Sequence, residues 1–142
     1  MVRDYDESAP IWISRVAVCI TAQHNSQRLI DEAARYADTQ NAELHILHVN
    51  KGTSIFNNEQ TPILINRLFE YGSEKGGMVH LMCSEKVAET IGEFIEEYKI
   101  STVVLGEPPE ISGKDKRGTE SEFDRIEKVI KKHGTQIILV RR

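Results

Sequence analysis

The residues best suited to binding chemistry lie in a long loop in the last third of the chain and at the start of the helix predicted after it. Residues 106–118 are rich in glycine, proline and charge. The basic residues of this loop are Lys114, Lys116 and Arg117. Glycine lets backbone N–H groups approach phosphate oxygens, and a helix N-terminus adds partial positive charge. Gly118 and Thr119, at the end of the loop, are therefore candidate phosphate ligands.

Simpler interpretations of the same residues stay open. Thr119 and Glu122 fit a capping box, with Thr119 as the N-cap and Glu122 at the third helical position. A basic loop run is more often simply solvated than bound to a ligand. Glu120, Glu122 and Asp124 put negative charge at the helix start, which opposes a triphosphate there. Helix capping and phosphate binding are thus both predicted for this segment.

The histidines give little support for a metal site or for catalysis. His45 and His48 are three residues apart in a strand-like run, so their side chains point to opposite faces of a sheet. His80 lies in another such run and can neighbour one of them, as a polar member of a half-buried strand. His24 is a candidate ligand contact in the loop 21–25. The sequence has no nucleophile with a placed base, no paired carboxylates and no Walker-type GxxxxGK[ST], so no enzyme is predicted.

The elements that position these residues begin with a strand, loop, helix and strand over residues 15–49. An apolar run at 16–20 is followed by a short polar loop, and Asn25 or Ser26 caps a helix with apolar residues at helical spacing. A second apolar run spans 44–49. The connection is long enough for parallel strands, so a right-handed β-α-β unit is expected. Ligands of open α/β sheets bind beyond the carboxyl ends of the strands, which nominates the loop 21–25.

Strands and helices alternate through the rest of the chain. Thr61-Pro62 starts a helix, with the proline at its first position. The remaining elements are a strand at 78–83, a helix over 87–98, a strand at 102–105, a helix with Phe123, Ile126, Val129 and Ile130, and a strand at 136–140. This order predicts a single-domain α/β fold, Rossmann-like, with an open five-stranded parallel sheet and helices on both faces.

The amino-acid composition limits the classes of protein to which the chain can belong. The chain has 142 residues, 39% of them hydrophobic and 28% charged, which suits one globular domain. The net charge of −4 argues against broad nucleic-acid binding. No apolar run approaches a membrane span, and the start of the chain is acidic where a signal peptide is basic, so a cytoplasmic protein without membrane contact is expected. Cys19 and Cys83 lie in apolar runs and are expected to be buried, reduced thiols.

With these elements placed, residues 15–142 resemble a universal stress protein (UspA-like) domain. The resemblance rests on RVAVCI in the first strand, Asn25-Ser26 at the first helix start, AARYA in that helix, AELHILHV in the second strand and STVVLG in the fourth. The AAR core of the first helix is most similar to the stress-protein-type domain of KdpD sensor kinases. The resemblance implies strand order 3-2-1-4-5, a homodimer through the last strand and, in many members, an adenine nucleotide such as ATP or AMP. Residues 1–14 are then an N-terminal extension, whose Trp12 is expected to pack on the sheet edge or on a partner subunit.

Nucleotide-binding members carry an acidic residue after the first strand and, after the fourth, a motif of G, two residues, G, nine residues, G and S or T. Here Thr21 stands at the acidic position and Pro109 at the second glycine, while Gly118-Thr119 arrives one residue early. Since proline has no N–H, the phosphate motif is degraded. By position, the implied contacts are Ile20, Thr21, Ala22 and Val49 around the base, with Gly106, Gly118 and Thr119 in the phosphate motif; no metal ligands are implied.

Together these features predict a small cytoplasmic regulatory protein that senses an adenine nucleotide through a degraded motif. The alternative is a dimeric interaction module without nucleotide binding, which Thr21 and Pro109 favour. A cyclic dinucleotide is a third ligand class that the kinase-domain resemblance suggests. A protein partner in stress signalling is expected under each reading, and its identity is left open.

Overall fold

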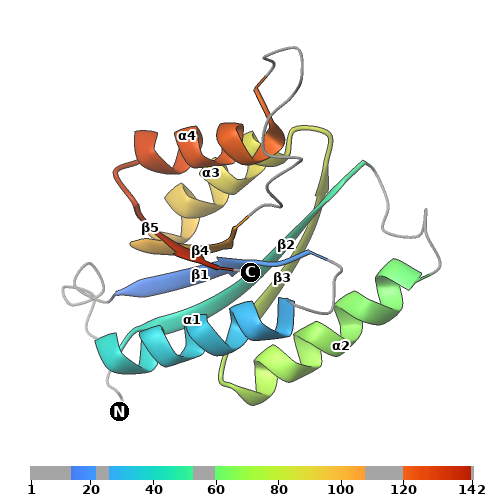
Figure 1. Ribbon diagram of the computed structural model, residues 1–142, viewed down its shortest axis with the longest axis vertical. Helices are drawn as coiled ribbons and strands as arrows, with labels where there is room; N and C mark the ends of the chain where they lie inside the picture. The colour runs from blue at the N-terminus through green and yellow to red at the C-terminus, as the bar shows by residue number, and fades with distance from the viewer. Residues whose placement is uncertain (1–13, 22–25, 53–59, 108–119, 142) are drawn as a thin grey trace.

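The computed structural model describes residues 14–21, 26–52, 60–107 and 120–141, apart from the side chains of residues 60 and 61. Strands and helices alternate along this part of the chain (Figure 1). The strands are β1 (Arg15–Cys19), β2 (Glu43–Lys51), β3 (Met78–Ser84), β4 (Thr102–Gly106) and β5 (Gln136–Val140). The helices are α1 (Ser26–Gln40), α2 (Gln60–Glu74), α3 (Val87–Tyr98) and α4 (Glu122–Lys132).

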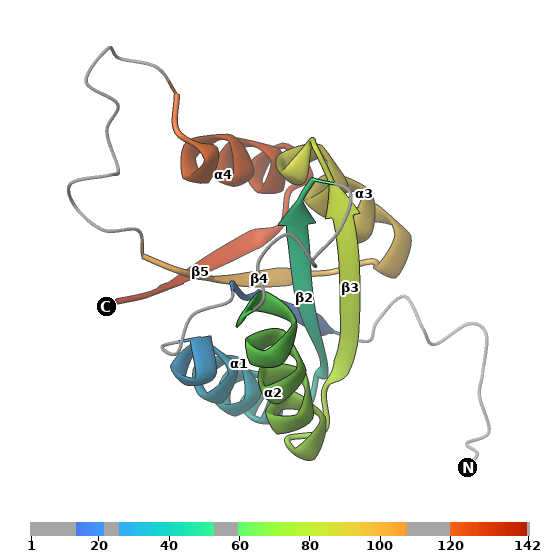
Figure 2. The same ribbon diagram turned by 90° about the vertical axis from the view of Figure 1, so that its right-hand side faces the viewer.

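The five strands form one parallel sheet in the order β3-β2-β1-β4-β5. Val18 in β1 is level with Ile46 in β2 and Val104 in β4. Helices α1 and α2 cover one face of the sheet, and α3 and α4 cover the other (Figures 1 and 2). The predicted fold class and strand order are confirmed. Within the described residues, no helix is long and apolar enough to cross a membrane.

The core has two halves because the central strands bury side chains on both faces. Ile46 packs with Ile30 on the side of α1 and α2. Its neighbour Leu47 packs with Phe94 and Ile130 on the side of α3 and α4. Alternate residues of β2 therefore serve different layers, as the period of two in a strand requires.

A glycine sets how closely α2 approaches the sheet. Gly72 is buried in the last turns of α2, and a Cβ atom there would overlap Ile46 Cδ1 of β2. Ile46 is itself fully buried, so it has little space in which to move aside. Gly72 thus allows α2 to lie directly on the central part of the sheet.

The two cysteines are both expected from the sequence to be buried, but Cys19 is half-buried and Cys83 is exposed. Burial raises the pKa of the Cys19 thiol to about 12, in keeping with a structural role. Cys83 is exposed, so the prediction of a buried thiol there is wrong. Cys83 lies in β3, an edge strand whose side chains are covered less completely than those of the central strands.

Helix starts also differ in detail from the expectations. Ser26 is the first residue of α1 and bonds back to Thr21, so it is not the predicted cap, while Asn25 lies outside the described residues. Helix α2 begins at Gln60, which makes Pro62 its third residue. The cap of α4 is Ser121, not Thr119, because the Ser121 side chain accepts from Asp124 N at 3.0 Å and Asp124 Oδ2 accepts from Ser121 N at 3.4 Å. The predicted capping box therefore exists two residues further along.

Candidate functional site

The carboxyl end of β1 is the centre of the predicted site, and its backbone is already hydrogen-bonded within the chain. Ile20 N donates to Leu47 O at 2.9 Å, and Ile20 O accepts from the His48 ring nitrogen Nδ1 at 2.8 Å. The Ser26 hydroxyl donates to Thr21 O at 2.8 Å and accepts from Thr21 N at 3.3 Å. The backbone N–H groups of Ile20 and Thr21 are therefore both hydrogen-bonded within the chain. Of the backbone groups of these two residues, only the second lone pairs of the carbonyl oxygens are left for a ligand.

His48 is a residue whose contribution the sequence did not reveal. A carbonyl oxygen only accepts hydrogen bonds, so Nδ1 of His48 carries the proton and Nε2 is left as an acceptor. The side chain is buried, and Nε2 has no hydrogen-bond partner among the described residues. His48 thus ties the end of β1 to β2 and holds its ring in one tautomer.

Strand β2 extends further than the predicted 44–49, because its pairing with β3 continues to Lys51 opposite Ser84. Val49 is therefore not the end of the strand; it is half-buried and level with Met82 of β3. The strand instead carries Lys51 to the carboxyl edge, where its ammonium group is exposed. Lys51 stands in a polar stretch without a motif, so the sequence alone does not mark it as a site residue.

Gly106 has a packing reason as well as a motif position. It is the last residue of β4 and lies opposite Val140 of β5. A Cβ atom at this position would lie 3.2 Å from Leu29 Cδ1, in the first turn of α1. Glycine thus lets the start of α1 pack closely against the end of β4. These are the elements that border the switch point of the sheet, between β1 and β4.

The start of α4 faces the same edge and is acidic. Glu122 and Asp124 occupy its first turn, as expected from the sequence. Lys51 Nζ lies 3.9 Å from Glu122 Oε1, and Lys128 forms an ion pair with Glu120. Two of the three acidic residues in this region are therefore partly neutralised, and Lys51 is a cation at the edge where a phosphate is expected.

Other predicted site residues lie outside the described part of the chain. These are Ala22, His24, Pro109, the basic residues of the long loop, Gly118 and Thr119. The structure places Ile20, Thr21, Val49 and Gly106 at or near the carboxyl edge. The assignment of all seven implied contacts stays a prediction.

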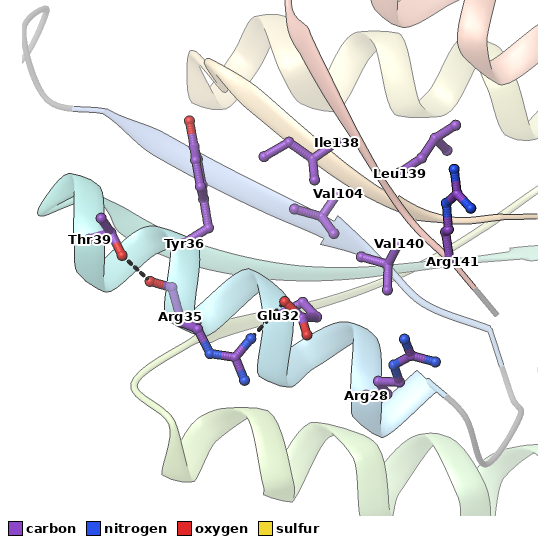
Figure 3. A pocket seen from close by; sticks show the side chains of 10 residues that line it. All are labelled: Arg28, Glu32, Arg35, Tyr36, Thr39, Val104, Ile138, Leu139, Val140 and Arg141. Atoms are coloured by element: carbon purple, nitrogen blue, oxygen red, sulfur yellow. Dashed lines mark hydrogen bonds and ion pairs between the residues drawn. The ribbon is translucent and has the colours of Figure 1, made fainter.

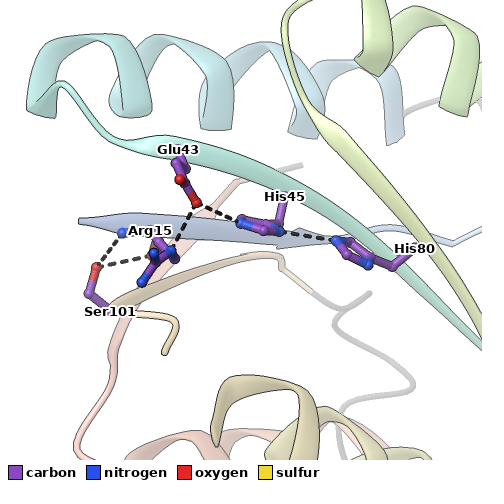
Figure 4. Close-up of polar contacts among 5 residues, drawn as sticks. All are labelled: Arg15, Glu43, His45, His80 and Ser101. Carbon is purple, nitrogen blue, oxygen red and sulfur yellow. Dashed lines mark hydrogen bonds and ion pairs between the residues drawn. The ribbon is translucent and has the colours of Figure 1, made fainter. Parts of the chain in front are cut away.

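A second polar cluster lies between the sheet and α3, nearer to the amino ends of the strands (Figure 4). Glu43 Oε1 accepts from Arg15 Nε at 2.8 Å and lies 3.3 Å from His45 Nε2. His45 Nδ1 lies 3.0 Å from His80 Nε2, and the two rings are stacked. His80 also contacts the rings of Phe94 and Tyr98 edge-on. As predicted, His80 neighbours one of the two β2 histidines in a partly buried layer.

The hydrogen bonds of this cluster have a direction. A carboxylate accepts, so His45 Nε2–H donates to Glu43 and His45 Nδ1 accepts from His80 Nε2–H. A further proton on His45 would bring two N–H groups against each other at 3.0 Å. Burial lowers the pKa of His45 and of His80, and in His80 a charge on His45 lowers it further. Arg15 and His45 hold the pKa of Glu43 below its usual value, although partial burial opposes them.

This cluster does not form a metal site on its own. Within the described ranges, no three His, Cys, Asp or Glu side chains are grouped so that they could hold a metal ion. His48 is on the opposite face of β2 from His45, as predicted. The cluster therefore acts as an internal polar network that joins β1, β2 and β3.

Known proteins match this chain in their three-dimensional structure, whereas comparisons of sequence find no match. No family model matches the chain, and no curated protein matches it. A universal stress protein solved in complex with cAMP matches with a TM-score of 0.67 and 18% identity, over 91% of this chain and 97% of that chain. A universal stress protein from Archaeoglobus fulgidus in complex with dAMP matches with a TM-score of 0.60 and 18% identity, over 91% and 98%. UspA from Lactobacillus plantarum matches with a TM-score of 0.56 and 16% identity, over 90% and 97%.

These matches extend over nearly the full length of both chains, and they agree with the strand order observed here. The resemblance seen in short segments of sequence is therefore matched by the arrangement of the whole sheet. The protein has the fold of the universal stress proteins.

Proposed function

We propose that this protein is a cytoplasmic regulatory protein of the universal stress protein type that binds an adenine nucleoside monophosphate at the carboxyl edge of its sheet. The observation that carries the proposal is the likeness to two proteins of this fold solved with cAMP and with dAMP. Each of those ligands has an adenine base and a single phosphate. The proposed role is sensing without catalysis, in keeping with the buried and bonded positions of His45 and His48.

The charges at this edge favour a monophosphate over ATP. Lys51 offers one cation beside the N-terminus of α4, where the helix dipole attracts an anion. Glu122 and Asp124 are in the first turn of the same helix and repel additional phosphate charge. The Ser121 hydroxyl already accepts from Asp124 N, so one of the free N–H groups of the helix start is occupied. A short anion suits this environment better than a long one.

The first test is isothermal titration of the protein with AMP, cAMP, ATP and cyclic dinucleotides at constant ionic strength. We expect AMP or cAMP to bind, and Lys51→Glu to weaken binding about tenfold or more, because a charge-assisted hydrogen bond contributes roughly 1.5–3 kcal/mol. Lys51 is 64% exposed, so its replacement leaves the core intact.

The matched control is Lys99→Glu, which changes the net charge equally. Lys99 is exposed and caps the C-terminus of α3, at the opposite edge of the sheet. Its replacement is expected to leave the affinity unchanged. Equal weakening by both variants would count against a phosphate beside Lys51, and the absence of binding by every nucleotide would refute the proposal.

One observation favours the alternative of an interaction module without nucleotide. The N–H groups of Ile20 and Thr21, which the resemblance places around the base, are bonded to Leu47 and Ser26. Under this alternative the carboxyl edge binds no ligand, and the protein works by binding a partner through the surface of its dimer. The same titration separates the two functions, because only the first predicts heat of binding.

We also propose that the protein is a homodimer through β5. This strand is at the end of the sheet, so the backbone N–H and C=O groups along its outer side have no strand beside them within the described residues. Such an edge pairs readily with another strand. Leu139 in β5 is 44% exposed and would contact its counterpart in the partner.

Sedimentation velocity is expected to show a dimer that Leu139→Arg converts to a monomer, because the replacement puts like charges at the two-fold axis. Leu81→Arg is the matched control. Leu81 is 43% exposed and lies in β3, the opposite edge strand. Dissociation by Leu81→Arg alone would assign the dimer to β3 instead, and a monomeric wild-type protein would exclude both edges.

A further inference from the structure

Among the described helices, none lies directly over the face of β5 that looks towards α1, and Ile138 and Val140 on this face are only half-buried. Helix α1 packs on β1, β2 and β4, and α2 packs on β2 and β3. Beyond α1, the side chains of Ile138 and Val140 therefore border a groove of about 430 Å³ between α1 and β5 (Figure 3). A groove of this volume beside an edge strand has room for a few side chains of an extended segment.

The two ends of the groove carry different kinds of side chain. Its floor is apolar, formed by Val104, Ile138 and Val140. Arg28 and Arg141 lie together at one end, on either side of Val140 (Figure 3). Both are exposed, and none of the described carboxylates pairs with either of them, in contrast to the ion pair of Arg35 with Glu32.

The opposite end of the groove carries the aromatic ring of Tyr36, beside the ion pair of Arg35 with Glu32. The Tyr36 hydroxyl donates to Gln136 Oε1 at 3.4 Å. A matching occupant therefore has apolar and aromatic side chains at one end and carboxylates at the other. The distance along α1 from Arg28 to Thr39 is about 17 Å, at 1.5 Å per residue.

The first thirteen residues of this chain have that pattern. They read MVRDYDESAPIWI, with carboxylates at Asp4, Asp6 and Glu7 and an apolar group at 11–13 that contains Trp12. In an extended chain, the distance from Trp12 to Asp6 or Glu7 is about 16–20 Å. The spacing between the apolar group and Asp6 or Glu7 thus fits the length of the groove, and the negative charge of these carboxylates is complementary to Arg28 and Arg141.

The point where this segment joins the domain is close to the aromatic end of the groove. Ser14 precedes β1 and its carbonyl oxygen accepts from Glu43 N at 2.9 Å. Arg15 N donates to Ser101 Oγ at 3.1 Å, and Ser101 O accepts from Gln136 N at 3.1 Å. Only β4 separates β1 from β5, a distance of about 10 Å across two strand spacings. Three extended residues cover that distance.

We infer that residues 1–13 dock in the groove between α1 and β5, with Trp12 over Ile138 beside Tyr36 and the carboxylates of Asp4, Asp6 and Glu7 near Arg28 and Arg141. The segment covers the open face of β5 and leaves its outer edge available to a second strand. The inference does not depend on nucleotide binding. It gives the N-terminal extension an intramolecular role.

Trp12 is the only tryptophan in the chain, so its fluorescence reports on the segment directly. We expect a blue-shifted emission from the chain of 142 residues and slow quenching by acrylamide. Arg28→Glu with Arg141→Glu should raise the quenching constant several-fold and shift the emission to the red. Adding Asp4→Lys, Asp6→Lys and Glu7→Lys to that variant should restore the protection.

The matched control is Arg67→Glu with Lys132→Glu, which makes the same change in net charge at exposed positions of α2 and α4. It is expected to leave Trp12 protected, and circular dichroism verifies that each variant is folded. A wild-type Trp12 as accessible as N-acetyl-tryptophanamide would overturn the inference. Equal effects of the two double variants, or protection that survives reversal of the groove charges, would also overturn it. Protection that is lost on dilution would assign the groove to the segment of a second copy and exclude docking within the chain.

Discussion

Replacing Phe94 with alanine is expected to lower the free energy of unfolding by about 3–5 kcal/mol, the usual cost of removing a large aromatic ring from a core. Phe94 is 1% exposed, in the half of the core between the sheet and α3. Its ring centroid lies 4.6 Å from that of Tyr98 and 4.8 Å from that of His80. The substitution removes these contacts together with apolar burial, and leaves a cavity that the surrounding strands fill only in part.

Urea unfolding followed by circular dichroism measures this effect, and the slope of free energy against urea should be unchanged. In a thermal scan the midpoint should fall by about 10–20 °C for a chain of this size. Glu93→Ala is the matched control, because Glu93 is the exposed neighbour on the same helix and its loss is expected to cost less than about 0.5 kcal/mol. Similar midpoints for the two variants would show that the ring is not packed as described.

The second expected result is a marked loss of stability when the pH falls from 7.5 to 5. Burial lowers the pKa of His45 and His80 below the 6.5 of the unfolded chain, with Glu43 and Glu97 opposing and Arg15 assisting. Below about pH 6.5 the unfolded chain therefore binds more protons than the folded chain. The stabilisation is fully present above that pH and is lost as the pH falls through the folded pKa values.

The carboxylate of Glu43 does not contribute to the expected change in stability between pH 7.5 and 5. Arg15 and His45 hold its pKa below 4.5, against the opposing effect of burial, so its contribution is lost only at lower pH. The histidine pair thus accounts for the change between pH 7.5 and 5. The hydrogen-bond geometry gives the reason, since His45 Nδ1 already accepts from His80 Nε2–H and has no free lone pair for a proton.

The measurement is urea unfolding at several pH values with a variant that removes one imidazole. His80→Phe keeps a flat ring beside Phe94 and Tyr98, and the loss of stability from pH 7.5 to 5 should be smaller than in the wild type. His133→Gln removes an exposed imidazole at the end of α4 and should not change the loss. A pH dependence that is the same in all three proteins would contradict the assignment to the His45 and His80 pair.

The carboxyl edge is held by side-chain bonds that no sequence motif indicates. Thr21 could be recognised from its motif position, but its bonds to Ser26 and the bond of Ile20 to His48 could not. The pairing of Lys51 with Glu122 joins the end of β2 to the start of α4, and nothing in either segment predicts it. The capping box of α4 was expected two residues too early because Thr119 and Ser121 both precede an acidic residue by three positions.

The alternation of apolar runs and amphipathic stretches determined the α/β fold by itself, because helices and strands have fixed periods of 3.6 and 2 residues that a short window of sequence reveals. The strand order was implied by resemblance alone. Tertiary structure decided which backbone groups at the end of β1 are hydrogen-bonded, that His45 lies beside His80, and that Arg28 and Arg141 line the same groove. His45 and His80 are 35 positions apart and Arg28 and Arg141 are 113 positions apart, and only the strand order and the packing of helices on the sheet bring them together.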